Sequence, residues 1–187
     1  KVRHILNLET CISVVAAYFY GKFVDQIKGD KINYREINMT RYVDWFITTP
    51  IMLLVLCLAF LYNTGGSLHF VTFLKILVLN FAMLSSGYLG ETGSIEKMTG
   101  WLIGMVLFFM LYGYIYYKFL YKKSMFDNQI LYWAFFTFWI FYGLVYHRPE
   151  KFKNVSFNYL DLFAKCFVGI FFWAYFTGVF TLKSSGV

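Results

Sequence analysis

The sequence predicts an all-α membrane protein, a bundle of spanning helices that forms a single domain over residues 1–187. Of its residues, 59% are hydrophobic and only 14% are charged, which leaves too few polar side chains to cover a water-exposed surface. Apolar runs of about 20 residues recur along the chain, the length that a helix needs to cross a bilayer. The gaps between these runs are too short to hold a second domain. We therefore expect an integral, multi-pass membrane protein.

Six apolar stretches have the required length, and short polar segments separate them. They cover residues 9–27, 42–62, 69–89, 99–121, 129–147 and 158–182. Residues 63–67 (Asn-Thr-Gly-Gly-Ser) and 90–93 (Gly-Glu-Thr-Gly) are typical turn sequences. The chain should therefore form six helices joined by short loops.

The charge and cysteine patterns exclude several classes of protein. The net charge is +7, but the basic residues are mostly confined to the gaps, whereas a nucleic-acid-binding protein gathers them in a polar domain. Cys11, Cys57 and Cys166 are odd in number and lie within apolar runs, which argues against a disulfide framework. We predict no nucleic-acid partner, no metal site and no enzymatic activity.

A few charged residues lie inside the apolar stretches, where an unpaired charge costs several kcal/mol. Asp161 and Lys165 are four residues apart and share one helix face. Arg41, Asp44 and Thr48 share a face of another helix. If the two faces meet, two positive and two negative charges form a neutral cluster, as burial requires. The alternative is a purely structural ion pair between Asp161 and Lys165.

Two further charges lie near helix ends. Lys75 can extend its side chain to the membrane surface, so we expect no functional role for it. Glu9 lies about one turn inside the first stretch and either faces the lipid headgroups or is buried. The sequence alone leaves both alternatives open.

A buried lysine has a characteristic chemistry. Its desolvated amine is a nucleophile toward aldehydes and forms a Schiff base, which needs a carboxylate counterion when it is protonated. Aromatic side chains in the same stretches could wall a flat conjugated ligand. They are Trp45, Trp101, Trp139, Tyr142 and Tyr146. The alternative for such aromatics is contact with lipid or an interfacial belt.

Three segments together resemble the microbial (type 1) rhodopsins. Residues 41–50 (Arg-Tyr-Val-Asp-Trp-Phe-Ile-Thr-Thr-Pro) resemble the third-helix signature of that family. Residues 160–165 (Leu-Asp-Leu-Phe-Ala-Lys) are similar to the last-helix motif, whose lysine carries retinal. Trp139, Tyr142, Gly143 and Tyr146 match the sixth-helix pattern, with glycine where many members have proline. The resemblance implies a seven-helix rhodopsin-type bundle, of which this chain contains the second to seventh helices.

The resemblance also implies a role for each motif residue. Lys165 would bind all-trans retinal as a Schiff base, with Asp44 and Asp161 as counterions. Asp44 would be the primary proton acceptor, Thr48 its neighbour one turn on, and Arg41 would shape the extracellular exit. The implied pocket consists of Trp45, Thr49, Met52, Met83, Gly87, Trp101, Gly104, Phe108, Trp139, Tyr142, Tyr146, Ala164 and Lys165. Met52 takes the spectral-tuning position, where an apolar residue accompanies green absorption.

The cytoplasmic side departs from the archaeal pumps of the family. With the family topology, Lys1 is cytoplasmic and the loop at residues 25–35 is extracellular. The archaeal proton donor lies eleven residues after the counterion, where this chain has Val55, which cannot donate a proton. Such a departure resembles the viral rhodopsin clade. We expect Glu9, protonated at rest, to replace the donor, and Glu150 to be a solvated loop charge.

These features predict light-driven outward proton transport, with a light-gated ion channel as the alternative. A sensory photoreceptor is a third reading, but no signalling domain is attached. A chloride pump would need a neutral residue at Asp44, and a sodium pump would be expected to show an Asn-Asp-Gln triad in place of Asp44, Thr48 and Val55. The expected partners are the lipid bilayer, protons or small cations, and further copies of the chain in a trimer or pentamer.

Overall fold

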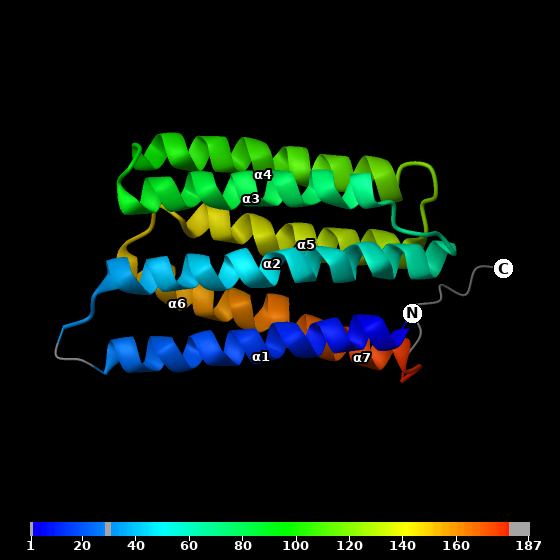
Figure 1. The fold of residues 1–187 in the computed structure, drawn as a ribbon, viewed down its shortest axis with the longest axis horizontal. Coiled ribbons are helices and arrows are strands. Elements are labelled where there is room, and N and C mark those ends of the chain that lie inside the picture. Colours follow the sequence, from blue (N-terminus) through cyan, green and yellow to red (C-terminus); the bar gives the residue numbers. More distant parts are fainter. Residues whose placement is uncertain (1, 29–30, 180–187) are drawn as a thin grey trace.

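The computed structural model describes residues 2–28 and 31–179, which form helices and no strand. The helices lie side by side along one common direction (Figure 1). The first five are α1 (Val2–Ile27), α2 (Tyr34–Thr64), α3 (Phe70–Thr92), α4 (Lys97–Phe119) and α5 (Phe126–Val145). A sixth rod is continuous but changes its winding, through α6 (Glu150–Asp161), the π-helix η1 (Leu162–Phe167) and α7 (Val168–Phe176). The predicted six helices are therefore present.

Five of the six helices begin before the predicted positions, whereas α4, α5 and the sixth rod end before theirs. The sixth rod begins at Glu150, directly after Pro149, eight residues before the predicted position 158. Helix α2 begins at Tyr34 rather than residue 42. Apolar length marks only the part of a helix that lies in hydrocarbon, and polar turns continue beyond it. Residues 180–182 of the last predicted stretch lie outside the described residues.

Within the described residues, four of the six rods have the length and mean hydropathy that a membrane-spanning helix needs. These are α2, α3, α4 and the rod from Glu150 to Phe176. Helix α1 carries Arg3, Glu9, Lys22 and Asp25, which lower its mean hydropathy. Helix α5 has three polar residues directly after Phe126 and contains Trp and Tyr, which hydropathy scales do not rank as strongly apolar. Both lie alongside the four apolar rods (Figure 1).

Local signals set the helix ends. The Asn33 side chain accepts a hydrogen bond from the backbone N–H of Glu36 at 3.3 Å and caps the start of α2. Helix α2 ends at Gly65, whose φ of 71° is left-handed, and α3 ends in the same way at Gly93 with a φ of 77°. Glycine adopts this conformation without steric cost, which explains both of the predicted turns.

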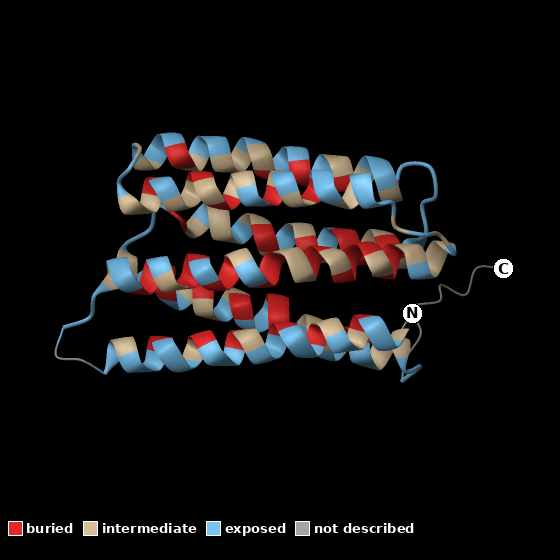
Figure 2. Cartoon of the chain, viewed as in Figure 1, coloured by how far each residue is buried: buried red, intermediate tan, exposed pale blue. Residues whose placement is uncertain are grey.

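Buried residues lie mainly on the faces of the helices that point into the bundle (Figure 2). Large apolar residues such as Phe70 and Val106 stay 77% and 59% exposed, as expected for positions that face lipid. Helices α3 and α4 pack closely through small residues. A methyl group added at Gly100 would lie 2.7 Å from the carbonyl oxygen of Ser86 and 3.0 Å from the Cα of Gly90. Helix α2 lies in the middle of the bundle (Figure 1), where it carries Arg41 and Asp44.

Candidate functional site

Lys165 lies at the centre of a buried cluster of four charges. Its Nζ is 2.5 Å from Asp44 Oδ2 and 3.7 Å from Asp161 Oδ2. Arg41 Nη1 lies 3.4 Å from the same Asp161 oxygen. All four side chains are at most 2% exposed. The two helix faces thus meet, and their charges sum to zero, the arrangement that a low-dielectric interior requires.

The local helix geometry positions these side chains. Thr48 and Thr49 each donate a hydrogen bond to the carbonyl oxygen four residues earlier, Asp44 O at 2.9 Å and Trp45 O at 2.8 Å. Thr48 therefore bonds the backbone of Asp44 rather than its carboxylate. Lys165 lies within the π-helical segment η1, whose wider turn is frequent at functional sites.

The two aspartates have very different partners. Asp161 Oδ1 accepts hydrogen bonds from Tyr142 Oη at 2.7 Å and from Trp45 Nε1 at 3.3 Å, and Oδ2 accepts one from Tyr20 Oη at 3.0 Å. Asp44 pairs with Lys165 alone, and its Oδ1 has no partner among the described residues. Donors to a carboxylate stabilise its charged form. Asp161 is surrounded by hydrogen-bond donors, whereas Asp44 has Lys165 as its one donor among the described side chains.

A cavity opens beside Lys165, between α2, α3, α4, α5 and the sixth rod. Every residue of the predicted pocket lines it except Ala164, which packs its small side chain into the hydrophobic core instead. The sequence analysis named Asp161 as a counterion, and that residue also lines the cavity. Lining residues that it did not name for the pocket are Tyr42, Leu84, Gly100, Met105, Ile140, Gly143 and Phe157. Tyr42 and Gly143 stand inside the quoted motifs, so the motifs could have indicated them.

Glycines give this cavity its shape. A methyl group at Gly87 would lie 2.5 Å from Tyr42 Oη, and one at Gly143 would lie 2.5 Å from Met105 Sδ. The carbonyl oxygen of Gly143 also accepts a hydrogen bond from Trp101 Nε1 at 2.8 Å. Larger side chains at these two positions would therefore collide with Tyr42 and Met105, which line the cavity.

Helix α1 contributes two side chains to the site. Glu9 is 7% exposed, and a methyl group at Gly169 would lie 3.1 Å from its Oε2. Gly169 follows Lys165 by four residues, so the Glu9 carboxyl lies inside the bundle, about one helical turn from the lysine. The sequence analysis did not identify Tyr20. Its spacing of eleven residues from Glu9, close to three helical turns, places both on one face and could have indicated it.

On the opposite side of Lys165, Arg41 begins a chain of polar contacts. Its Nη2 donates to Asn158 Oδ1 at 2.8 Å and to Asn154 Oδ1 at 3.3 Å. Asn154 donates to Asn38 Oδ1 at 3.1 Å, and Asn38 donates to Glu150 Oε2 at 2.9 Å. The expectation that Glu150 is a solvated loop charge is therefore wrong, because the helix starts at this residue and turns its carboxylate toward α2.

A spanning helical bundle with a buried lysine, two carboxylates and an aromatic cavity defines an integral, multi-pass membrane protein of the rhodopsin fold. The family model of the bacteriorhodopsin-like proteins matches residues 1–179, and the chain belongs to that family. Members of the family bind retinal through a Schiff-base lysine and are typically transporters or photoreceptors.

Solved structures agree with this assignment. Viral rhodopsin OLPVRII is 50% identical, with a TM-score of 0.89, over 96% of this chain and 85% of its own. A blue light-absorbing proteorhodopsin from Med12 shares the fold at 22% identity, with a TM-score of 0.74, over 92% of this chain and 80% of its own. The matched helices correspond to the rhodopsin fold without its first helix.

Curated relatives match a shorter segment. A green-light absorbing proteorhodopsin of Gamma-proteobacterium EBAC31A08 is 37% identical over 75 residues, which is 38% of this chain and 28% of the relative. A green-light absorbing proteorhodopsin of an unknown prokaryotic organism matches to the same extent. The match thus spans less than a third of the length of these relatives.

Proposed function

We propose that this chain binds retinal at Lys165 and uses light to move protons outward across a membrane. One observation carries the proposal. Lys165 Nζ lies 2.5 Å from Asp44 Oδ2, and Asp44 has no other hydrogen-bond partner among the described residues. Asp161 is saturated with donors, so the two carboxylates are suited to different tasks.

The cavity fits retinal. Its walls are mostly apolar and aromatic, and Gly87 and Gly143 leave space for the lining side chains of Tyr42 and Met105. Lys165 is the one lysine among the lining residues. Bound retinal supplies the light absorption and the isomerisation that move the nitrogen of Lys165 and change its acidity.

Asp44 accepts the proton from the Lys165 nitrogen. Its Oδ2 is already within hydrogen-bond distance, so the transfer needs no long movement. Asp161 keeps its negative charge because Arg41, Tyr20, Tyr142 and Trp45 all stabilise it. From Asp44 the proton then leaves on the side of Arg41, where polar side chains continue toward the end of the bundle.

Glu9 returns a proton to Lys165 from the opposite side. Val55 cannot do so, and Glu9 is the carboxyl that α1 places near Gly169. A protonated carboxyl is far cheaper to bury than a carboxylate, so Glu9 stays neutral without a cation beside it. The family topology puts the start of α1 in the cytoplasm, which makes the transport outward.

A light-gated channel is the competing function. A channel needs a continuous polar path, whereas Leu53, Leu56 and Phe60 fill the Val55 side with fully buried apolar side chains. This dry layer favours a pump, in which access alternates between the two sides. Met52 is an apolar residue at the spectral-tuning position, which supports absorption of green light by the bound retinal.

The test uses the protein reconstituted with all-trans retinal in liposomes, alongside voltage-clamped photocurrents. A pump changes the pH against a gradient, loses this change when a protonophore is added, and gives current of one sign at all voltages. Lys165→Ala is the control and should give a colourless protein without light-driven transport. Photocurrents that reverse at an ion's equilibrium potential would establish the channel instead, and a visible retinal band in Lys165→Ala would exclude Lys165 as the attachment site.

A further inference from the structure

A second cluster of four charges lies outside the cavity, at the end of the bundle where α3, α4 and α6 meet. It consists of Glu91 from α3, Lys97 from α4, and Glu150 and Lys153 from α6. The Lys153 side chain is 0% exposed and that of Glu91 is 8% exposed. Lys97 and Glu150 are at the rim, at 36% and 38%. Burial of an unpaired ammonium group is unfavourable, so the buried Lys153 depends on the two carboxylates beside it.

The buried ammonium lies between the two carboxylates. Lys153 Nζ is 2.5 Å from Glu91 Oε1 and 2.9 Å from Glu150 Oε1. Asn38 Nδ2 also donates to both, at 2.9 Å each. Lys97 is more distant, 3.6 Å from Glu91 and 3.7 Å from Glu150. Lys153 is therefore the cation that joins the pair, and Lys97 adds a weaker contact from the rim.

No other titratable side chain among the described residues makes a hydrogen bond or ion pair to these carboxylates. Tyr146 lies below both ammonium groups, 5.2 Å from Lys97 Nζ and 6.0 Å from Lys153 Nζ, but its hydroxyl donates to the carbonyl oxygen of Gly87. Two lysines thus balance two glutamates, and the cluster is neutral with both carboxylates ionised.

Without Lys153, the two carboxylates would keep only the more distant Lys97, and the repulsion between their charges would favour a proton shared between them. Lys153 occupies the place where that proton would lie. A series of hydrogen bonds connects this cluster to the site around Lys165. It runs from Asp161 through Arg41, Asn154 and Asn38 to Glu91. A proton that leaves Asp44 on this side therefore reaches a pair of groups that hold no proton of their own.

We infer that Lys153 takes the place of a shared proton, keeps Glu91 and Glu150 ionised, and thereby sets the timing of proton release. The exit then has no stored proton to release early, and a proton reaches the outer medium only when Asp44 itself gives one up. The statement on timing rests on the proposed transport. The statement on charge concerns the protein in the dark and stands independently of transport.

The first experiment records infrared spectra of the full chain with retinal, in the dark at neutral pH. The wild type should contain no protonated carboxyl that Glu91→Gln or Glu150→Gln removes. Lys153→Met should gain one protonated carboxyl, which a second substitution, Glu91→Gln, abolishes. Lys97→Met is the matched control: it removes the same charge from the rim and should add no protonated carboxyl, and Lys153→Arg should behave as the wild type.

The second experiment follows release with a pH-sensitive dye in the bulk after a flash. In the wild type, release should coincide with deprotonation of Asp44, whereas in Lys153→Met it should shift to an earlier phase. A protonated Glu91 or Glu150 in the wild type would overturn the inference even if Lys153→Met does not fold. Release before Asp44 deprotonates in the wild type would also overturn it. A protein that transports no protons but shows the expected spectra would refute only the transport.

Discussion

The two halves of the bundle on either side of Lys165 are built differently. On the Arg41 side, hydrogen-bonded side chains run from Asp161 through Arg41 and Asn38 to Glu91. On the Val55 side, apolar side chains fill the interior, and Leu53 and Val55 have no exposed surface. One half already contains a polar route, and the other is closed by hydrocarbon.

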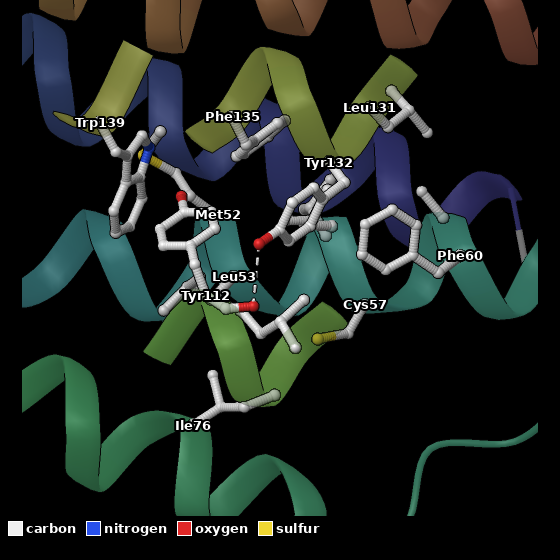
Figure 3. Packing of buried hydrophobic residues seen from close by; sticks show 14 of the residues in the cluster. Met52, Leu53, Cys57, Phe60, Ile76, Tyr112, Leu131, Tyr132, Phe135 and Trp139 are labelled. Carbon is white, nitrogen blue, oxygen red and sulfur yellow. Dashed lines mark hydrogen bonds between the residues drawn. The ribbon is translucent and has the colours of Figure 1, made fainter. Parts of the chain in front are cut away.

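The closed half is not apolar throughout. Its core packs Met52, Leu53, Cys57 and Phe60 of α2 against aromatic residues of α4 and α5 (Figure 3). Beyond this layer, Asn63 donates to Asn128 Oδ1 at 2.7 Å, and the Tyr175 hydroxyl donates to Asp127. A polar cap at the end of the bundle and the site at Lys165 are thus separated by a dry layer.

The difference between the polar Arg41 side and the apolar Val55 side indicates which step of the proposed cycle should be slow. Buried polar groups must be hydrogen-bonded, so the Arg41 side is a connected network before any light is absorbed. A dry layer carries no proton by itself, so return of a proton depends on Glu9 and on an opening of the helices. The path by which the proton leaves is therefore present before illumination, whereas the path by which a proton returns must form in each cycle.

The largest effect on transport is expected from substitution of Asp44, which tests how the two aspartates of the site divide their tasks. Asp44→Asn removes the acceptor and the counterion charge, so it should abolish light-driven transport and shift the absorption to the red. Flash photolysis and the liposome assay measure both. If Asp44→Asn still shows a deprotonated Lys165 nitrogen and still transports protons, Asp161 is the acceptor and the assignment of the two carboxylates must be exchanged.

Glu9→Gln should slow return of the proton to the Lys165 nitrogen on the order of 100-fold, the usual size of a lost general acid. The decay should become steeply dependent on pH, because bulk protons replace the donor, and azide should restore the rate. Asp25→Asn removes a carboxylate of the same helix that is 81% exposed and is the control. An unchanged decay in Glu9→Gln would refute its role and favour the channel.

Val55→Asp places a carboxyl in the layer of buried apolar side chains. It tests whether the lack of polar groups there limits the return of a proton to Lys165. In the Glu9→Gln background, it should recover part of the lost rate. It should also lower the free energy of unfolding by about 1–3 kcal/mol, because the new polar group has no partner there. Denaturation and flash photolysis of the double variant measure these effects. A fully stable variant without any recovery would show that entry does not depend on this layer.

The smallest effect on transport is expected at Tyr20, which only strengthens the network on Asp161. Tyr20→Phe removes one hydrogen bond to a buried carboxylate and should lower the free energy of unfolding by roughly 1.5–3 kcal/mol, with transport retained. Tyr18→Phe is the matched control, because Tyr18 is 59% exposed. Equal stability of the two variants would show that Tyr20 contributes nothing to holding the charge of Asp161.

The sequence by itself determined the helices and most of the cavity. In a membrane each helix must satisfy its own backbone, so apolar length locates it without reference to its neighbours. The motifs at residues 41–50 and 160–165 likewise specified Asp44, Asp161 and Lys165, because spacing along one helix places Asp161 beside Lys165 and Arg41 on the same face as Asp44. Helix ends were less accurate, since polar turns such as Glu150–Lys153 carry no apolar signal.

Only the tertiary structure decided which faces meet. Tyr20 reaches Asp161, Glu9 reaches Gly169, and Lys153 joins Glu91 to Glu150 across helices that are far apart in the sequence. Each contact depends on the rotation and depth of two rods, which packing of the whole bundle sets and local spacing does not. The division between an open polar half and a dry half therefore became visible only when the helices were assembled.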